Sequence, residues 1–361
     1  MIYVFRGLVA FCFIASTCSF IFPTLKHCKD KLVSMNIAGD TIARKDILHD
    51  IWIVGAGKLG GYILNELSSQ EFPILRSHSD SHRLNIVAET QSSLRQNDIE
   101  STGAQFRLRE QRTVDDEGSA RTVIICIPPS SSSDYAEEVD TATRLWAGPS
   151  KGGNLVFTSS IGVYGECPGC IVTESSDVDT SSPRSKELIA AEDRVLNKGG
   201  RVVRLAGLYE AQRGPHAYWL NRAKEMSPVS TAPATDANTR IIRGSADGRL
   251  NMLHYEDAAR IVLTLANNID DLPSRIFLVC DNDWISREEM CSAALASGLF
   301  PGSPMPEFAL KTVIQSKRCD NSLTRKLLHW QPKHTSFRVY MRRLGGETLS
   351  DMPQSTAAAV P

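Results

Sequence analysis

Short apolar runs alternate with amphipathic segments through the middle of the chain. Four runs rich in β-branched and other apolar residues are typical of strands, and they cover residues 51–54, 85–89, 122–127 and 154–157. The run at 122–127 is apolar almost without interruption, as expected of a strand that is buried on both faces of a parallel sheet. Segments with apolar residues at helical spacing separate these runs. The alternation predicts an α/β fold with a doubly wound parallel sheet.

The chain begins with a segment that does not follow this pattern. An apolar run at Leu8–Ala15 comes after Arg6 and is followed by small residues, an arrangement typical of a secretory signal peptide. The run is marginal for a bilayer span of about 20 apolar residues, and an uncleaved membrane anchor is the alternative. Residues 20–48 have an excess of basic residues and no sustained apolar period, which indicates a second targeting segment.

The junction between these two segments is Ser19-Phe20-Ile21-Phe22-Pro23. It resembles the junction in bipartite leaders of secondary plastids, in which a phenylalanine opens the transit peptide. We therefore expect residues 1–48 to be a targeting leader and the plastid to be the destination, with the secretory pathway as the alternative. Residues 345–361 are rich in Ser, Thr, Ala and Pro, and we expect a disordered tail there.

The composition of the 361 residues narrows the class of protein. The formal net charge is −1, and no basic stripe with interleaved aromatic residues is present, so nucleic-acid binding is not indicated. Hydrophobic residues at 42% and charged residues at 22% are ordinary for a folded globular protein. Nine cysteines are too few for a disulfide-rich secreted scaffold of this length. We expect a folded protein whose mature chain has no membrane span.

A glycine motif stands between the first expected strand and a helix. The sequence Gly55-Ala56-Gly57-Lys58-Leu59-Gly60 directly follows residues 51–54, and this setting makes it a dinucleotide-binding signal. Gly55 permits a tight turn, Gly57 lets a pyrophosphate approach the backbone, and Gly60 lets the helix pack on the strand. We expect Lys58 and Leu59, in the first helical turn, to take part in binding the pyrophosphate. A glycine-rich turn without a ligand is the alternative.

The expected second strand ends in an acidic residue, Glu89. A carboxylate there accepts hydrogen bonds from both hydroxyls of the adenosine ribose and repels a 2′-phosphate, which favours NAD. Arg76, Arg83 and Arg95 lie near in sequence, and one of them folded onto the site would favour NADP instead. Pro128, after the run at 122–127, begins a loop that we expect to pass the cofactor. The predicted cofactor is NAD or NADP, with NAD slightly favoured.

The expected strand at 154–157 leads into Thr-Ser-Ser-Ile-Gly-Val-Tyr-Gly, residues 158–165. This segment resembles a signature of the NAD-dependent epimerase/dehydratase family, the extended and atypical short-chain dehydrogenase/reductases. The resemblance continues in the family's order over roughly residues 50–340, in the segments 202–209, 250–259, 284–289 and 328–332. It implies a Rossmann-type NAD(P)-binding domain at residues 49–204 and a smaller C-terminal α/β part at residues 205–344 that binds the substrate.

The same resemblance implies catalytic residues. In the family, a serine at the position of Ser160 orients the substrate, and a Tyr-x-x-x-Lys pair moves the proton and holds the nicotinamide ribose. Lys186 matches the family lysine, but Ser182 stands where the tyrosine is expected. A serine hydroxyl is far less acidic than a phenol, so the family's acid/base group is missing. Tyr164 and Tyr209 are the nearest alternative proton donors, unless both are packed structural aromatics.

Arg213 and His254 are expected in the substrate pocket. Arg213 follows the segment 202–209 in a loop that faces the substrate in the family, where a guanidinium can bind a phosphate or carboxylate with two hydrogen bonds. His254 lies in a segment that completes the pocket in relatives, and a structural histidine is the alternative. The stretch 228–239, rich in Pro, Ser, Thr and Ala, is expected to be a mobile loop or lid.

Cys167 and Cys170 form a C-x-x-C pair after the serine signature. They are either a redox pair near the substrate mouth or two inert loop cysteines. Zinc is disfavoured because no second cysteine pair supplies the remaining ligands, and we expect no metal site.

The sequence therefore predicts an NAD(P)-dependent oxidoreductase or epimerase-like enzyme for a polar small molecule, with nucleotide sugars as one such class. The alternative is a dinucleotide-binding regulator or an RNA-associated plastid protein that keeps the fold without the chemistry. Nothing in the sequence indicates an oligomeric state.

Overall fold

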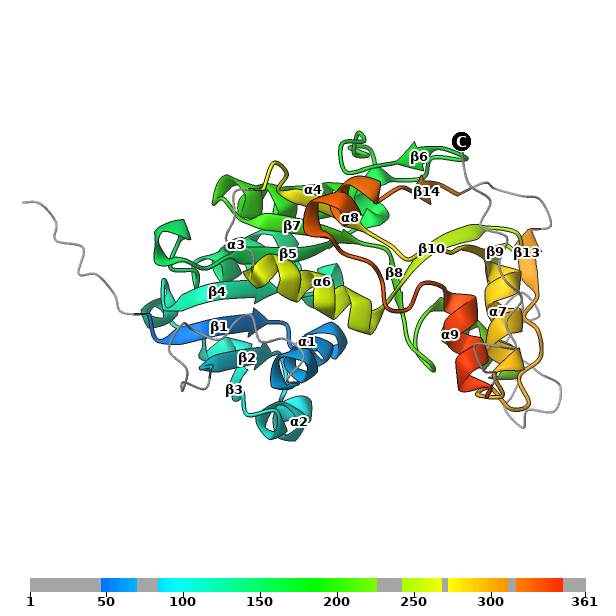
Figure 1. Cartoon of the computed structure of the whole chain (residues 1–361), viewed down its shortest axis with the longest axis horizontal. Helices are drawn as coiled ribbons and strands as arrows, with labels where there is room; N and C mark the ends of the chain where they lie inside the picture. The colour runs from blue at the N-terminus through cyan, green and yellow to red at the C-terminus, as the bar shows by residue number, and fades with distance from the viewer. Residues whose placement is uncertain (1–46, 70–83, 226–241, 268–271, 311–315, 347–361) are drawn as a thin grey trace, which may run out of the picture. The chain divides into compact units, whose positions relative to one another are not determined.

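A parallel β-sheet forms the centre of the protein (Figure 1). The computed structural model describes residues 47–69, 84–225, 242–267, 272–310 and 316–346, and within them this sheet has seven strands. In spatial order these are β3 (Gln105–Leu108), β2 (Ile86–Thr90), β1 (His49–Val54), β4 (Ala120–Ile125), β5 (Leu155–Ser160), β7 (Arg201–Leu205) and β11 (Ile276–Val279). Every neighbouring pair is parallel, which confirms the predicted sheet.

Helices cover both faces of this sheet, and this explains the continuous apolar runs of its central strands. Helix α1 (Lys58–Ser68) packs on α6 (Tyr255–Asn267), and α3 (Tyr135–Thr143) packs on α4 (Pro183–Asn197). Right-handed crossovers put α1 and α3 on opposite faces, because β2 and β5 lie on opposite sides of β1. Figure 1 shows α6 in front of the sheet. The short α2 (Gln96–Ser101) connects β2 to β3.

The order of the strands reverses between β1 and β4. From β1 the chain proceeds to β2 and β3 on one side, and it then returns to β4, β5 and β7 on the other side. Loops that leave two such strands at their carboxyl ends run in opposite directions and leave a crevice between them. The glycine motif follows β1 directly, so it lies at this crevice.

The C-terminal part has a second, smaller hydrophobic core. It lies between a three-stranded sheet and three helices, with Tyr209, Met252 and Phe337 among its buried residues. The sheet contains β8 (Gly207–Tyr209), β10 (Arg249–His254) and β12 (Trp284–Ser286), and the helices are α5 (Pro215–Glu225), α7 (Arg287–Ala296) and α9 (Phe337–Leu344). Two short strand pairs and one helix complete the described elements: β6 (Ile171–Val172) with β14 (Arg318–Cys319), β9 (Ile242–Ser245) with β13 (Phe308–Leu310), and α8 (Ser322–Leu328).

The expected division of the chain at residue 204 does not coincide with the edge of the central sheet. Strand β11 comes later in the sequence and hydrogen-bonds to β7, and α6 packs against α1. The described residues form one unit. The C-terminal part therefore both builds its own small core and completes the central sheet.

Several expected features fall outside the described residues. They are most of the leader, Arg76 and Arg83, the stretch 228–239 and most of the tail. Among the helices that are described, none is both long enough and apolar enough to cross a bilayer.

Candidate functional site

The turn between β1 and α1 is shaped by its glycines. Gly55 has a φ angle of +87°, and a Cβ there would lie 2.8 Å from Cγ2 of Ile127. A Cβ on Gly60 would lie 3.0 Å from the carbonyl oxygen of Gly55, so only glycine lets α1 lie this close to the turn. The tight turn and the close packing predicted for these two glycines are confirmed. Gly57 is different, because the atom nearest to its Cβ position is 4.0 Å away.

This turn opens onto a cavity of about 620 Å³ at the carboxyl ends of the central strands. That volume lies within the range of about 300–1,000 Å³ for small-molecule sites. The expected site residues that line it are Gly55, Gly57, Lys58, Leu59, Glu89, Pro128, Ser160 and Arg213. The expected site residues that do not line it are Gly60, Tyr164, Lys186 and His254. The fold therefore brings the glycine turn and the family's serine into one space.

The N-terminus of α1 is uncapped in the described part of the chain. Gly57 is its N-cap residue and makes no side-chain hydrogen bond, and the first turn holds no acidic residue. Free backbone N–H groups and the helix dipole favour an anion at such a position. The side chain of Lys58 turns to the carboxylate of Glu210, at 2.7 Å, and the Tyr62 hydroxyl donates to the same carboxylate at 2.7 Å. These contacts connect the first turn of α1 to the loop after β8.

Strand β2 carries Glu89 into the cavity wall, where only 1% of the residue is exposed. Arg112 donates to both of its carboxylate oxygens, with Nε at 3.1 Å and Nη2 at 2.5 Å. Since the Arg112 side chain is only 9% exposed, this is a buried ion pair. The sequence analysis did not identify Arg112 as a partner of Glu89, because Arg112 follows the neighbouring strand β3. Arg112 offsets the repulsion that Glu89 would exert on a 2′-phosphate.

Two further arginines line the same cavity. Nη1 of Arg95 donates to the carbonyl oxygen of Ala56 at 3.2 Å and also to that of Gly57, so its guanidinium lies on the glycine turn. Arg109 lines the cavity as well and forms an ion pair with Glu138 at 3.2 Å. Of the three arginines that the sequence suggested near the adenosine ribose, the structure places Arg95 at the site.

At the other end of the cavity, Ser160 is present and the family's Tyr-Lys pair is not. The hydroxyl oxygen of Ser160 accepts a hydrogen bond from the Gly162 N–H at 3.1 Å. Ser182 caps α4 by accepting from the Ser185 N–H. Lys186 is exposed, in contrast to the expectation that it holds the nicotinamide ribose. The physical reason is helical spacing: α4 buries Ser185 and Leu188, and a residue one position after Ser185 points about 100° away from that face.

Tyr164 has a structural role in place of the catalytic one that we expected. It is 5% exposed, and its hydroxyl donates to the carbonyl oxygen of Thr173 at 2.8 Å and accepts from Arg204 at 3.1 Å. Arg204 also binds Glu192, which accepts from the Ser159 hydroxyl at 2.6 Å. Burial raises the pKa of Tyr164, although the nearby Arg204 opposes this. These hydrogen bonds connect Tyr164 to β7 and, through Glu192, to β5. Tyr164 is not among the residues that line the cavity.

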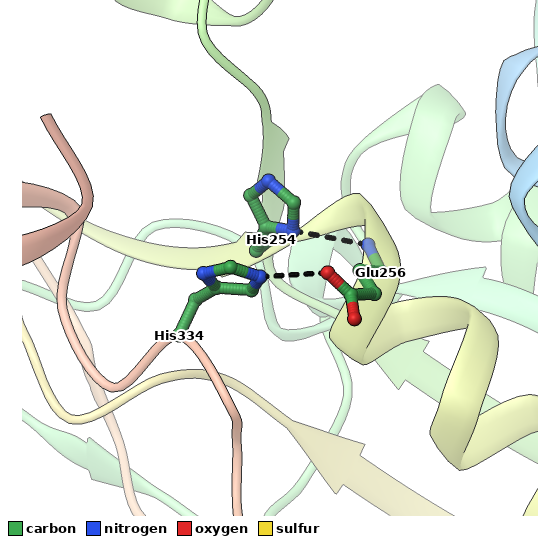
Figure 2. Close-up of side chains that lie close together, drawn as sticks. All are labelled: His254, Glu256 and His334. Atoms are coloured by element: carbon green, nitrogen blue, oxygen red, sulfur yellow. Dashed lines mark hydrogen bonds and ion pairs between the residues drawn. The ribbon is translucent and has the colours of Figure 1, made fainter. Parts of the chain in front are cut away.

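His254, expected in the substrate pocket, is buried and is not among the residues that line this cavity. Its Nδ1 accepts from the backbone N–H of Glu256 in the first turn of α6 (Figure 2). The Glu256 carboxylate in turn lies 2.8 Å from Nε2 of His334 and also pairs with Lys333. Burial and the adjacent His334 lower the pKa of His254 to about 3. The three side chains in Figure 2 offer metal-ligand atoms within 4.8 Å of one another. Nδ1 of His254, the Glu256 carboxylate and Nε2 of His334 are engaged in the contacts described above, whereas Nε2 of His254 is buried without a hydrogen-bond partner in the described part of the chain.

The tyrosines that line the cavity are Tyr135 and Tyr255, and the sequence analysis identified neither. The Tyr135 hydroxyl donates to the carbonyl oxygen of Ile127 at 2.9 Å. The Tyr255 hydroxyl accepts from Nε of Arg213 at 3.2 Å, and its ring stacks on Tyr62. Tyr209, the second proton donor that we considered, is fully buried in the C-terminal core. The signal that could have found Tyr255 is its position directly after β10, at the start of α6.

Cys167 and Cys170 are joined by a disulfide in the loop before β6. Neither cysteine is among the residues that line the cavity. The choice between a redox pair and an inert loop pair stays open.

The fold of this chain is similar to the folds of several solved structures. No protein-family model and no curated protein matches the chain. The chain is similar in structure to the UDP-glucuronic acid 4-epimerase from Bacillus cereus in complex with UDP-glucuronic acid and NAD (TM-score 0.60, 16% identity, 82% of this chain and 98% of that chain). It is also similar to MoeE5 in complex with UDP-glucose and NAD (0.57, 16%, 82% and 97%) and to a protein of unknown function from Silicibacter pomeroyi (0.58, 19%, 82% and 98%). The chain thus has the Rossmann-type fold of these proteins over most of its length.

Proposed function

We propose that the protein binds NAD or NADP and belongs to the NAD-dependent epimerase/dehydratase family of short-chain dehydrogenase/reductases. The observation that carries this proposal is the glycine turn at the strand-order reversal, which opens onto a cavity shared with Ser160. The open surroundings of Gly57 and the uncapped start of α1 fit a pyrophosphate. Two of the structural neighbours, the Bacillus cereus epimerase and MoeE5, are in complex with NAD.

The residues of the cavity have separate roles in this proposal. Backbone N–H groups of Lys58 and Leu59 would hold the pyrophosphate, and Glu89 would accept from the adenosine ribose. The loop that begins at Pro128 would run past the cofactor. Ser160 would orient a hydroxyl or carbonyl group of the substrate, and Arg213 would bind the substrate's phosphate or carboxylate. The bound nicotinamide would supply hydride transfer, which is the chemistry that a polypeptide lacks.

The charged residues around Glu89, where the adenosine ribose would lie, affect the relative affinity for NAD and NADP. One carboxylate, Glu89, faces this end, but Arg112 neutralises it, and Arg95 and Arg109 line the same cavity. We infer that NAD is favoured over NADP by less than about tenfold, which corresponds to less than about 1.4 kcal/mol of binding free energy.

For the reaction, we propose an oxidoreductase or epimerase-like conversion of a polar small molecule, with nucleotide sugars as the first class to test. The UDP-glucuronic acid and UDP-glucose bound in two of the structural neighbours support this choice. A non-catalytic dinucleotide-binding regulator is the second candidate, and the helix-capping Ser182 together with the exposed Lys186 favours it.

Calorimetry with NAD and NADP tests the binding proposal. Two readouts after addition of UDP-glucose or UDP-glucuronic acid then separate the two candidates: absorbance of the reduced nicotinamide, which detects net oxidation, and chromatography of the sugar products, which detects epimerisation. Binding with turnover supports the enzyme, binding without turnover of either sugar supports the regulator, and no binding of either dinucleotide contradicts both.

We also propose that the leader, residues 1–48, delivers the protein to a secondary plastid. This proposal rests on the sequence around Phe20, which lies outside the described residues.

A further inference from the structure

The cavity lacks the family's acid/base tyrosine, so a proton donor and acceptor must come from another residue if the protein transfers hydride. Among the described residues that line the cavity, the hydroxyls and thiols belong to Thr90, Ser92, Cys126, Tyr135, Thr158, Ser159, Ser160 and Tyr255. Aliphatic hydroxyls are too weakly acidic for the task near neutral pH. Burial raises the pKa of the Cys126 thiol to about 12. Glu89 and Lys58 also line the cavity, but each is held in an ion pair, with Arg112 and Glu210 respectively. The two phenols are the candidates that remain.

The hydrogen bonds of the two phenols distinguish them. Tyr135 is 3% exposed and already gives its proton to the carbonyl oxygen of Ile127 at 2.9 Å. Burial also raises the pKa of Tyr135, which opposes loss of that proton. Tyr255 makes the opposite kind of contact, because its oxygen accepts from Nε of Arg213 at 3.2 Å. Within the described part of the chain, no acceptor takes the proton of Tyr255.

The pairing of Tyr255 with Arg213 resembles the family's pairing of a tyrosine with a lysine, because in both a cationic side chain lies beside the phenol. A guanidinium at hydrogen-bond distance stabilises negative charge on the phenol oxygen through a charge-assisted hydrogen bond. The ring of Tyr255 is fixed by stacking on Tyr62, with centroids 5.6 Å apart and planes 13° from parallel. Tyr62 is in turn held by its hydrogen bond to Glu210. The hydroxyl is thus positioned by two elements, α1 and the loop after β8.

We propose that Tyr255, supported by Arg213, is the proton-transfer residue of this protein in place of the missing tyrosine at position 182. In the oxidative direction, the substrate hydroxyl gives its proton to the phenolate oxygen of Tyr255, and the carbinol carbon gives its hydride to the nicotinamide ring. The carbon–oxygen single bond becomes a carbonyl. In the reductive direction, the Tyr255 hydroxyl gives its proton to the carbonyl oxygen as the hydride returns to carbon. The inference rests on the proposed nicotinamide chemistry and names the residue that completes it.

The first test compares Tyr255→Phe with two matched variants that each lose one phenol. The expected result is a fall of about 10²- to 10⁴-fold in the rate at which UDP-glucose or UDP-glucuronic acid is converted, whether by net oxidation or by epimerisation, with NAD affinity by calorimetry within twofold of the original protein. Tyr218→Phe, on the exposed face of α5, should change neither quantity. Tyr164→Phe tests the expectation from the sequence. A Tyr255→Phe protein that keeps its rate, or a Tyr164→Phe protein that alone loses it, overturns the proposal.

The second test requires no turnover. Tetranitromethane nitrates ionised phenols, so mass spectrometry of the treated protein should find nitrated Tyr255, and saturating NAD should protect it. Tyr218 should be nitrated with and without NAD. Arg213→Met should slow nitration of Tyr255 and leave that of Tyr218 unchanged.

Nitration of Tyr255 that is insensitive to both NAD and Arg213 overturns the assignment even where calorimetry shows that NAD binds. If calorimetry shows no binding of NAD or NADP, the proposed function itself fails, and this inference fails with it. If neither sugar is turned over, the nitration result decides the assignment alone.

Discussion

Substitution of Gly57 by valine tests the proposed dinucleotide site. A Cβ at this position meets no atom closer than 4.0 Å, so the variant should remain folded. A pyrophosphate that lies against this backbone would meet the added side chain directly. Loss of a single hydrogen bond to a charged group costs about 1.5–3 kcal/mol, so NAD affinity should fall by about ten- to a hundredfold.

Gly55→Ala is the matched control for this experiment, because the same motif predicts the opposite result there. The φ angle of +87° costs an alanine about 1–2 kcal/mol, and its Cβ would lie 2.9 Å from the backbone of residues 126 and 127. Crowding of this kind adds about 1–3 kcal/mol, so Gly55→Ala should lower the melting temperature by several degrees. Calorimetric titration with NAD and thermal unfolding of both variants are the assays. A Gly57→Val protein that is folded and binds NAD with unchanged affinity would refute the reasoning.

Three further predictions concern stability and delivery. Glu89→Ala should lower the free energy of unfolding by about 3–5 kcal/mol in denaturant titrations, because it leaves Arg112 buried and unpaired, whereas the double variant with Arg112→Met should lose less. His254 has a pKa of about 3 in the folded protein and about 6.5 in the unfolded chain, so its contribution to stability is fully present above pH 6.5 and is lost as the pH falls below that value. The free energy of unfolding should therefore fall by about 2 kcal/mol between pH 7 and pH 5 on account of this residue. His254→Gln should flatten this part of the curve of unfolding free energy against pH, and parallel curves for the two proteins would contradict the assignment. Residues 1–48 fused to a fluorescent reporter should reach the plastid of an alga with a secondary plastid, Phe20→Ala should prevent this, and a cytosolic signal from the intact leader would count against plastid delivery.

The sequence was sufficient for the sheet because its signals are local. Apolar runs, the glycine spacing and the alternation of strands and helices each depend on residues that are close in the chain, and the parallel sheet follows from them. The serine at the end of β5 and the glycines after β1 were found for the same reason. Gly55 and Ser160 lie far apart in sequence, but the carboxyl ends of parallel strands bring them to one edge.

The rest of the site could not be predicted, because it depends on pairs of residues that only the folded chain brings together. Arg112 reaches Glu89 from beyond the neighbouring strand, and Arg204 turns the Tyr164 hydroxyl away from the cavity. Lys186 had the correct spacing in the motif, but the buried face of α4 is set by Ser185 and Leu188. Motif spacing specifies which residue follows which, whereas side-chain direction depends on packing against other elements.

The contact between Gly55 and the end of β4 also determines when the site can form during folding. Strand β1 and its glycines leave the ribosome early, but the wall against which Gly55 turns is made of residues 126 and 127. This wall exists only after β4 has paired with β1, and such pairing between distant parallel strands is a slow, non-local step. A dinucleotide bound as proposed would therefore stabilise only chains in which this step is complete. It would shift the final equilibrium by mass action and would not act as a template for nascent β1.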